Sequence, residues 1–190
     1  MRMSVIPKTH ASRRAVERFI ADLYAYHYGA EIVHFPPALL ALQDRHGAIK
    51  CASGLRFAED GFFSEYYLDE PIEAALTRYA QAPIARHAIF EVTSLASAAP
   101  SAAMQFLRGV VAYGELAGFS WAFFTATGRL RLLLSKLDLP IITLGRAQRT
   151  RVLNPDAWGT YYETDPCVCA VDRAMAGAFL AQFSGEQVHA

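Results

Sequence analysis

The chain has 190 residues, of which 53% are hydrophobic, and its 18 basic side chains balance 18 acidic ones. This length predicts a single domain over residues 1–190, and the apolar content excludes intrinsic disorder. Because the net charge is zero, we expect no binding to nucleic acid. The longest apolar runs are far shorter than the roughly 20 residues that span a bilayer, and the first ten residues do not resemble a secretion signal. We therefore expect a cytoplasmic protein with no membrane span.

The first half of the chain predicts a helix, a hairpin, a further strand and a second helix. Apolar residues at three- and four-residue spacing, with charged residues opposite, predict the first helix, which ends at Gly29. Two apolar runs joined by the polar turn 44–47 predict the hairpin. A proline in its first turn and Asp69 as its cap mark the start of the second helix. In order, these elements cover residues 10–28, 39–43, 49–57, 62–68 and 69–81.

The second half of the chain alternates strands with helices. Residues 87–96 are almost all apolar or β-branched, which predicts a buried strand with a single charge, Glu91. Alternation of this kind favours parallel strand pairing. The order of elements predicts an α+β fold in three layers, α/β/α. The remaining expected elements are a helix over 101–116, a strand over 119–126, a helix over 128–137, strands over 140–144 and 158–163, and a helix over 171–183.

Three charged residues on the predicted strands are candidates for catalysis. Glu91 lies among apolar neighbours, where a carboxylate is either paired or has a raised pKa. With a raised pKa, it can accept a proton from an amine near neutral pH; the alternative is a structural pair with Arg86 or Arg56. Alternation along the expected strand also points Glu65 into a site, where Arg56 could pair the carboxylates or hold a phosphate.

Other residue patterns exclude several kinds of site. His27, Glu31 and His34 are metal-ligand types, but Gly29 breaks the helix that would align them, so we expect no metal site. The sequence has no nucleophile elbow, no phosphate-binding loop and no dinucleotide motif. The cysteines lack zinc-type spacing and are expected to be free thiols that pack in the core. They are Cys51, Cys167 and Cys169.

Short sequence blocks between residues 24 and 170 carry a resemblance to a known family. The blocks are Tyr28-Gly29-Ala30 with His34-Phe35-x-Pro37, Gly54-Leu55-Arg56, Glu65-x-Tyr67-Leu68-Asp69-x-Pro71-Ile72-Glu73, Glu91-Val92-x-x-Leu95-Ala96, Phe124-Thr125-Ala126-Thr127 and Trp158-Gly159-x-Tyr161-Tyr162. Through them the chain resembles the bacterial thermostable hemolysin family. Its layout is similar to the GNAT acyltransferases, and in particular to the acyl-homoserine-lactone synthases.

The resemblance implies a GNAT-like fold with a mixed central sheet whose middle strands splay apart. It implies an N-acyltransferase of the autoinducer-synthase type, which moves an acyl group from acyl-CoA or an acyl carrier protein to an amine. Glu91 would be the general base, with Arg56 and Glu65 beside it. The donor would be a substrate, acyl-CoA or acyl-phosphopantetheine, and no cofactor would be tightly bound.

Two positions depart from the pattern of these enzymes. Ser94 stands where the synthases have an arginine, and residues 97–102 replace a glycine-rich pyrophosphate loop, which disfavours acetyl-CoA. Amides at the start of the helix near Ser101 could still bind a phosphate. The donor is expected to contact Leu95, Ala96, Ser97 and Ser101. The other substrate-binding residues are expected to be Arg86, Thr93, Ser94, Thr125, Phe35 and Trp158.

A basic segment offers a possible docking surface. Residues 129–151 hold six basic side chains and one acid. A solvated basic face is the default interpretation. The functional alternative is docking of an acyl carrier protein or of CoA phosphates. The arginines expected to take part are Arg129, Arg131, Arg146 and Arg149.

Two other functions remain open at this point. A relative that lost catalysis would bind an acyl ligand or a partner, and Ser94 together with the altered loop favours this alternative. A membrane-damaging protein, which the family name suggests, is disfavoured because the sequence shows no exposed amphipathic segment with a basic polar face.

Overall fold

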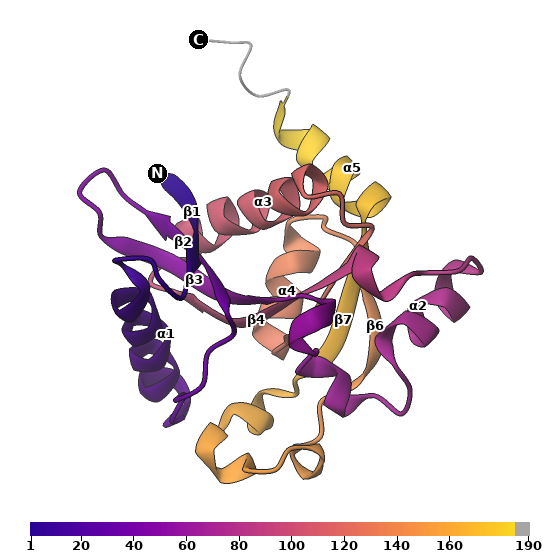
Figure 1. Ribbon diagram of the computed structural model, residues 1–190, viewed down its shortest axis with the longest axis horizontal. Coiled ribbons are helices and arrows are strands. Elements are labelled where there is room, and N and C mark those ends of the chain that lie inside the picture. Colours follow the sequence, from indigo (N-terminus) through magenta and orange to yellow (C-terminus); the bar gives the residue numbers. More distant parts are fainter. Residues whose placement is uncertain (185–190) are drawn as a thin grey trace.

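A seven-stranded mixed sheet forms the centre of the protein, with helices on both faces (Figure 1). The computed structural model describes residues 1–184. The strand order is β1-β2-β3-β4-β5-β7-β6. The strands are β1 Arg2–Pro7, β2 Ala38–Gln43, β3 Ile49–Arg56, β4 Ile89–Ser97, β5 Trp121–Ala126, β6 Ile142–Arg146 and β7 Cys167–Asp172. The helices are α1 Arg13–Tyr28, α2 Ile72–Ala80, α3 Pro100–Leu116, α4 Gly128–Lys136 and α5 Arg173–Ser184.

The helices divide between the two faces of the sheet. The hydrophobic clusters show that α1 and α2 cover one face, on which Ile89 and Phe123 lie. Helices α3, α4 and α5 cover the other face, where Phe90 and Val171 are buried. Side chains alternate between faces along a strand, so Glu91 shares the α1–α2 face with Ile89. The three-layer α+β fold expected from the sequence is confirmed.

The two central strands part in the middle of the sheet. β4 and β5 form a parallel pair, but their pairing ends at Val92 and Phe124 although both strands continue. Beyond that point β4 bulges, because its register against β3 shifts between Ala52 and Gly54 and Ser94 has a φ of 50°. A bulge bends the strand that carries it. The splayed middle strands expected from the resemblance are present.

Several elements differ from the sequence prediction. Residues 62–68 are not a strand, because both edges of β3 are already paired; they contain the 3-10 helix Ser64–Tyr67. Residues 158–163 are not a strand either; they belong to parts of two 3-10 helices. Gly159 lies between these helices, with a φ of 53° and its Cα close to the carbonyl of Tyr28. The expected helix over 171–183 begins later, at Arg173.

Two strands are absent from the sequence prediction. β1 precedes α1 and pairs antiparallel with β2, and β7 lies between β5 and β6, antiparallel to both. Parallel pairing is therefore limited to β4 and β5 among the strands described. The hairpin of β2 and β3 and the predicted α1, α2, α3 and α4 are confirmed within a few residues.

The cysteines agree with a further expectation. All three cysteines are buried and free of disulfides. Within residues 1–184, no helix has the length and apolar character needed to cross a membrane.

Candidate functional site

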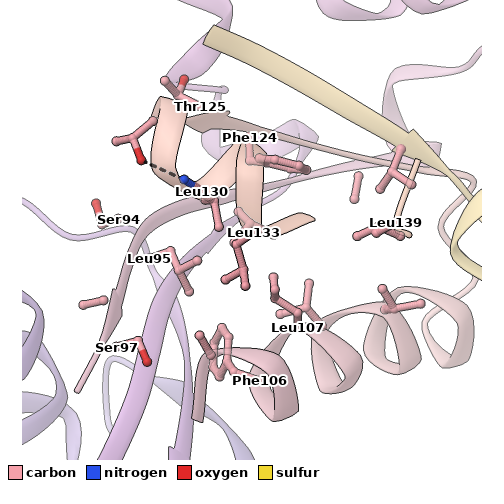
Figure 2. Close-up of a pocket in the computed structure, with 18 of the residues that line it drawn as sticks. Ser94, Leu95, Ser97, Phe106, Leu107, Phe124, Thr125, Leu130, Leu133 and Leu139 are labelled. Carbon is pink, nitrogen blue, oxygen red and sulfur yellow. Dashed lines mark hydrogen bonds between the residues drawn. The ribbon is translucent and has the colours of Figure 1, made fainter. Parts of the chain in front are cut away.

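A largely apolar cavity of about 540 Å³ opens where β4 and β5 part. Figure 2 shows Ser94 and Leu95 from β4 on one side of it, with Leu133 from α4 and Phe106 from α3 projecting into the space. Apolar walls with few polar groups suit an extended hydrocarbon ligand. The apolar residues labelled in the figure are Leu95, Phe106, Leu107, Phe124, Leu130, Leu133 and Leu139.

Polar groups lie at the rim of this cavity and where the strands diverge. The Thr127 hydroxyl caps α4 by accepting a hydrogen bond from the Leu130 amide at 3.2 Å. Ser94 and Thr125 lie on the two parted strands. The cationic residues of the lining are Arg129, Lys136 and Arg173.

Glu91 is fully buried on the other face of the same divergence. Its exposed fraction is 0%, and its two carboxylate oxygens accept hydrogen bonds from the amides of Phe63 and Ser64, both at 2.7 Å. Burial raises the pKa of Glu91, while the hydrogen bonds from Ser64 and Phe63 and the charge of Arg56 oppose that rise. A general base is expected to have such surroundings, in which burial and hydrogen bonds shift the carboxylate pKa in opposite directions.

The two amides that hold Glu91 come from the start of a helical turn. Phe63 precedes the 3-10 helix Ser64–Tyr67, and the first amides of a helical turn have no partner within it. Because these N–H groups would otherwise be buried without an acceptor, the Glu91 carboxylate and the turn satisfy each other. The turn therefore fixes where the carboxylate points.

Arg56 lies opposite Glu91 in the register of β3 and β4. Its Nη1 donates to the carbonyls of Asp60 and Gly61 at 3.4 and 3.3 Å, and its Nε is buried without a hydrogen-bond partner. The Thr93 hydroxyl is also buried and unpartnered. Within residues 1–184, Glu91 forms no ion pair with an arginine, so the alternative of a structural salt bridge for Glu91 is wrong.

Glu65 is held in an ion-pair network away from Glu91. Arg86 donates from Nη2 to Oε2 of Glu65 at 2.6 Å and from Nη1 to Glu73 at 2.7 Å. The remaining oxygen of Glu65 accepts the Ile72 amide at 3.0 Å and so caps α2. The expectation that strand alternation points Glu65 into the site is wrong, because residues 64–67 are helical. Arg86 and Glu65 thus connect α2 to two 3-10 helices, Arg86–Ala88 and Ser64–Tyr67.

Replacing Glu65 by alanine is expected to lower the free energy of unfolding by about 1–2 kcal/mol, because a helix cap and a charged pair are lost. Hydrogen bonds from Arg86 lower the pKa of Glu65. This contribution is therefore complete above the usual Glu pKa and is lost as the pH falls through the lowered value. Urea unfolding at pH 7 and at successively lower pH measures it. An equal loss at every pH would contradict this assignment.

The other predicted residues divide between the cavity and the opposite face. Five of them line the cavity: Ser94, Leu95, Ala96, Ser97 and Thr125. Ser101 is exposed on the first turn of α3 outside the lining. Phe35 and Trp158 pack against the core cluster that contains α1, not into the cavity. Thr93 lies beside Gly54 and Pro36 on the Glu91 face.

Sequence reasoning missed Ser64, which is buried and contacts both strands of the divergence. Its amide binds Glu91, and its hydroxyl accepts a hydrogen bond from Thr125 at 2.8 Å. The available signal was the block that surrounds Glu65. When that block is interpreted as a strand, it indicates the charged Glu65 as a site residue and gives no role to Ser64.

Most of the basic segment is neutralised by acids that lie outside it in sequence. Arg131 and Arg146 both bind Asp165, at 2.7 and 2.6 Å, and Arg149 binds Asp156 at 2.7 Å. Among the described residues, Arg129 forms no ion pair and lies at the cavity. The same part of the chain contains no cluster of three metal-ligand side chains.

Comparison with known proteins places this arrangement in a group of related folds. A search of curated proteins gives no match. The solved structure of TofI in an apo form has a TM-score of 0.65 at 12% identity, over 95% of this chain and 97% of that one. BjaI, a CoA-dependent acyl-homoserine lactone synthase solved with SAM and isopentyl-CoA, has a TM-score of 0.62 at 10% identity, over 96% and 89%.

FeeM, an N-acyl amino acid synthase from uncultured soil microbes, has a TM-score of 0.61 at 12% identity, over 94% of this chain and 98% of FeeM. At these identities the likeness shows the shared fold, and it confirms the GNAT-like architecture expected from the sequence. The family described as Thermostable hemolysin matches residues 6–176. Since that segment is most of the chain, the protein belongs to the thermostable hemolysin family, as its sequence blocks indicated.

Proposed function

We propose that the protein is an N-acyltransferase of the autoinducer-synthase type, which transfers an acyl group from a thioester to an amine. The observation that carries this proposal is the apolar cavity that opens beside the buried Glu91 at the divergence of β4 and β5. A cavity of this kind can hold an acyl chain, and a carboxylate with a raised pKa can accept the proton of an amine.

The acyl chain would lie between α3 and α4, with the thioester near the parted strands. Beyond Val92 the backbone of β4 has no partner on the β5 side, so its polar groups are available to the thioester carbonyl. The pantetheine would follow residues Leu95 to Ser97 toward the start of α3. There the amides of the first turn, near Ser101, favour a phosphate.

The amine would approach from the Glu91 side. Its nitrogen attacks the carbonyl carbon, the carbon–sulfur bond breaks, and the thiolate leaves. The nitrogen loses one proton to Glu91, and that proton is then available to the thiolate or to water. Arg56 and Thr93 each hold an unpartnered buried polar atom on this face, which suits an acceptor with its own polar groups.

The donor would be acyl-CoA or an acylated carrier protein. Arg129 and Lys136 line the cavity and can attract the phosphate of either donor. Since Arg131, Arg146 and Arg149 are engaged by acids, carrier-protein docking through them would require those pairs to be shared.

Thermal unfolding with CoA, butyryl-CoA, decanoyl-CoA and a decanoylated carrier protein tests the proposal first. A ligand at a hundredfold excess over its Kd adds about 2.7 kcal/mol of stability. Thiol release from the stabilising thioester is then measured with SAM, which is bound in the BjaI structure, and with amino acids, since FeeM is an N-acyl amino acid synthase.

The outcomes separate the functions. Stabilisation by acyl thioesters together with amine-dependent thiol release supports the transferase. Stabilisation by a thioester, with no thiol release whichever amine is added, would instead support a non-catalytic relative that binds an acyl ligand. Ser94 and the altered loop favour this alternative. No stabilisation and no thiol release would contradict both.

A further inference from the structure

The cavity reaches both faces of the sheet. Besides the residues of α3 and α4 described above, its lining includes Tyr24 and Tyr28 of α1 and also Tyr161, all of which pack in the core cluster beneath α1. Since α1 and α3 cover opposite faces, the space passes between the parted strands β4 and β5. The part lined by these three tyrosines is called the α1 end here, and its surroundings differ from the apolar walls between α3 and α4.

The three tyrosines of the α1 end form a continuous aromatic surface, the tyrosine wall. Tyr24 and Tyr28 lie about one helical turn apart on the same face of α1, and their ring centroids are 5.4 Å apart. Tyr161 contacts both rings, at 6.2 Å from Tyr24 and 5.3 Å from Tyr28. Rings arranged in this way can bind a further aromatic ring by stacking or by edge-to-face contact.

The hydroxyl groups of the tyrosine wall have no partner in the described protein. Tyr24 is 7% exposed and Tyr161 is 5% exposed, and buried tyrosine hydroxyls normally find a hydrogen-bond partner. Within residues 1–184, none of the three hydroxyls forms a hydrogen bond, whereas Tyr67 and Tyr162, outside the lining, pair with each other at 2.8 Å. Burial raises the pKa of each tyrosine of the wall, so its hydroxyl keeps its proton and can donate a hydrogen bond to a ligand.

One arginine lies at the same end of the cavity. The Thr160 amide donates to the Tyr28 carbonyl at 2.9 Å, and a few residues later the Thr164 carbonyl packs against Gly128, where α4 begins. These contacts bring the start of α4 beside the end of α1. Arg129, the second residue of α4, lines the cavity, is exposed, and forms no ion pair with the described residues.

The charges of the lining indicate which amine fits the α1 end. Its acidic residues are Glu115, in the last turn of α3, and Asp172, which pairs with Trp121 at the end of β5 opposite the divergence. A polyamine would therefore meet no accessible carboxylate at the α1 end. An amine that carries its own carboxylate would meet Arg129 and three hydroxyl donors, and charge-assisted bonds of this kind are strong.

We propose that the amine acceptor is an aromatic α-amino acid, whose carboxylate binds Arg129 and hydroxyls of the tyrosine wall and whose ring packs against that wall. The inference rests on the proposed transferase function and names the acceptor of that site. The nitrogen–carbon bond forms as the carbon–sulfur bond breaks, and the proton that the neutral amine gives up ends on the thiol. The product is an N-acyl aromatic amino acid. Arg129 is thereby assigned to the acceptor and not to the donor phosphate.

A panel of acceptors separates the two recognised groups. Phenylalanine has both ring and carboxylate, phenethylamine lacks the carboxylate, leucine lacks the ring, and SAM is the fourth acceptor. Thiol release from decanoyl-CoA gives kcat and KM for each. We expect the kcat/KM for phenylalanine to exceed that for phenethylamine about 10- to 100-fold. It should exceed the kcat/KM for leucine about three- to tenfold, and SAM should also be used less well than phenylalanine.

Two substitutions test the residues that would bind the carboxylate. Arg129→Gln removes the charge, and Tyr161→Phe removes only a hydroxyl. We expect each to raise the KM for phenylalanine about tenfold, with kcat and the KM for decanoyl-CoA within threefold of wild type. Neither should change the KM for phenethylamine, which has no carboxylate to lose. Arg129→Lys, which keeps the charge, should recover part of the loss.

Matched controls are available outside the cavity. Tyr162→Phe removes a tyrosine hydroxyl that does not line it, and Arg78→Gln removes an exposed arginine on α2. At a temperature where both variants are folded, we expect each to keep the wild-type KM for phenylalanine.

Two results would overturn the assigned acceptor and leave the transferase in place. A higher kcat/KM with phenethylamine, leucine or SAM than with phenylalanine would show that another amine is the substrate. Equal rises of the KM for phenylalanine and for phenethylamine in Arg129→Gln, or a rise confined to decanoyl-CoA, would show that Arg129 does not bind the acceptor carboxylate.

No thiol release with any acceptor would instead contradict the proposed function. Calorimetric titration of phenylalanine into the protein with CoA present then tests the α1 end separately. A Kd that Arg129→Gln raises about tenfold supports the amino-acid site. An unchanged Kd, or no binding by wild type, overturns it.

Discussion

Replacing Glu91 by glutamine is expected to lower kcat by about two to four orders of magnitude, the usual contribution of a general base. The glutamine side chain cannot accept the amine proton, but it has nearly the same shape. Because Glu91 does not line the cavity, the Kd for decanoyl-CoA should stay within a few-fold of wild type. Activity and thioester binding, measured on the same preparations, separate loss of chemistry from loss of substrate.

The stability of the same variant supplies an independent check. Burial raises the pKa of Glu91, so the folded protein holds this proton at a pH where the unfolded chain has lost it. Wild-type stability should then fall as the pH rises from the ordinary Glu pKa through the raised value. Glu91→Gln should lack that part of the slope. Its amide also faces an N–H of Phe63 or Ser64, which costs about 1–3 kcal/mol.

The matched control for this variant is Glu73→Gln. Glu73 is a partly buried carboxylate on α2 that accepts a charged hydrogen bond from Arg86 at 2.7 Å, and, like Glu91, it does not line the cavity. We expect Glu73→Gln to lose some stability and to keep kcat at a temperature where it is folded. Equal kcat for Glu91→Gln and wild type would remove Glu91 from the mechanism. Equal losses in both carboxylate variants would point to stability as the cause.

The affinity for acyl thioesters should rise steeply with chain length. Each methylene that leaves water contributes about 0.8 kcal/mol, which is about a fourfold change in Kd. From butyryl-CoA to octanoyl-CoA, four added methylenes therefore predict about a 200-fold lower Kd. Calorimetric titration over this series measures the gain per methylene, and a flat series would show that the chain does not enter the cavity.

Filling the cavity should abolish this dependence. Leu133 projects into it from α4, so Leu133→Trp would occupy the space of several methylenes (Figure 2). We expect the ratio of the Kd for butyryl-CoA to the Kd for octanoyl-CoA to fall to about tenfold or less. The Kd for butyryl-CoA itself should stay nearly unchanged. Leu153→Trp, at a fully exposed position, is the matched control and should behave as wild type. An unchanged Kd ratio in Leu133→Trp would show that the acyl chain binds outside this cavity.

Part of the site could be predicted because its signals are local. A single carboxylate in a run of apolar and β-branched residues identified Glu91 as a buried charge, since a charge there must be compensated. Residues 94–97 and Thr125 lie at the carboxyl ends of two strands that the sequence predicted, and the structure places them at the cavity. Periodicity likewise predicted α1, and the polar turn at residues 44–47 predicted the hairpin of β2 and β3.

The rest depended on contacts between distant segments. Residues 62–68 have the composition of a strand, but in the folded protein residues 64–67 form a 3-10 helix and the Glu91 carboxylate accepts hydrogen bonds from the amides of Phe63 and Ser64. The partner of Glu65 proved to be Arg86, and Asp165 neutralises two arginines of the basic segment. No spacing in the sequence encodes such pairs.

The sequence by itself determined the order of most elements and the buried charge at Glu91, because these follow from local periodicity and residue type. The family was indicated separately, by the resemblance of short sequence blocks. Only the tertiary structure decided that β4 and β5 part beyond Val92, since that depends on a bulge against β3. It alone joined Thr125 to Ser64, which lie 61 positions apart in the chain. Hydrogen bonds over such distances form only where packing brings two segments together.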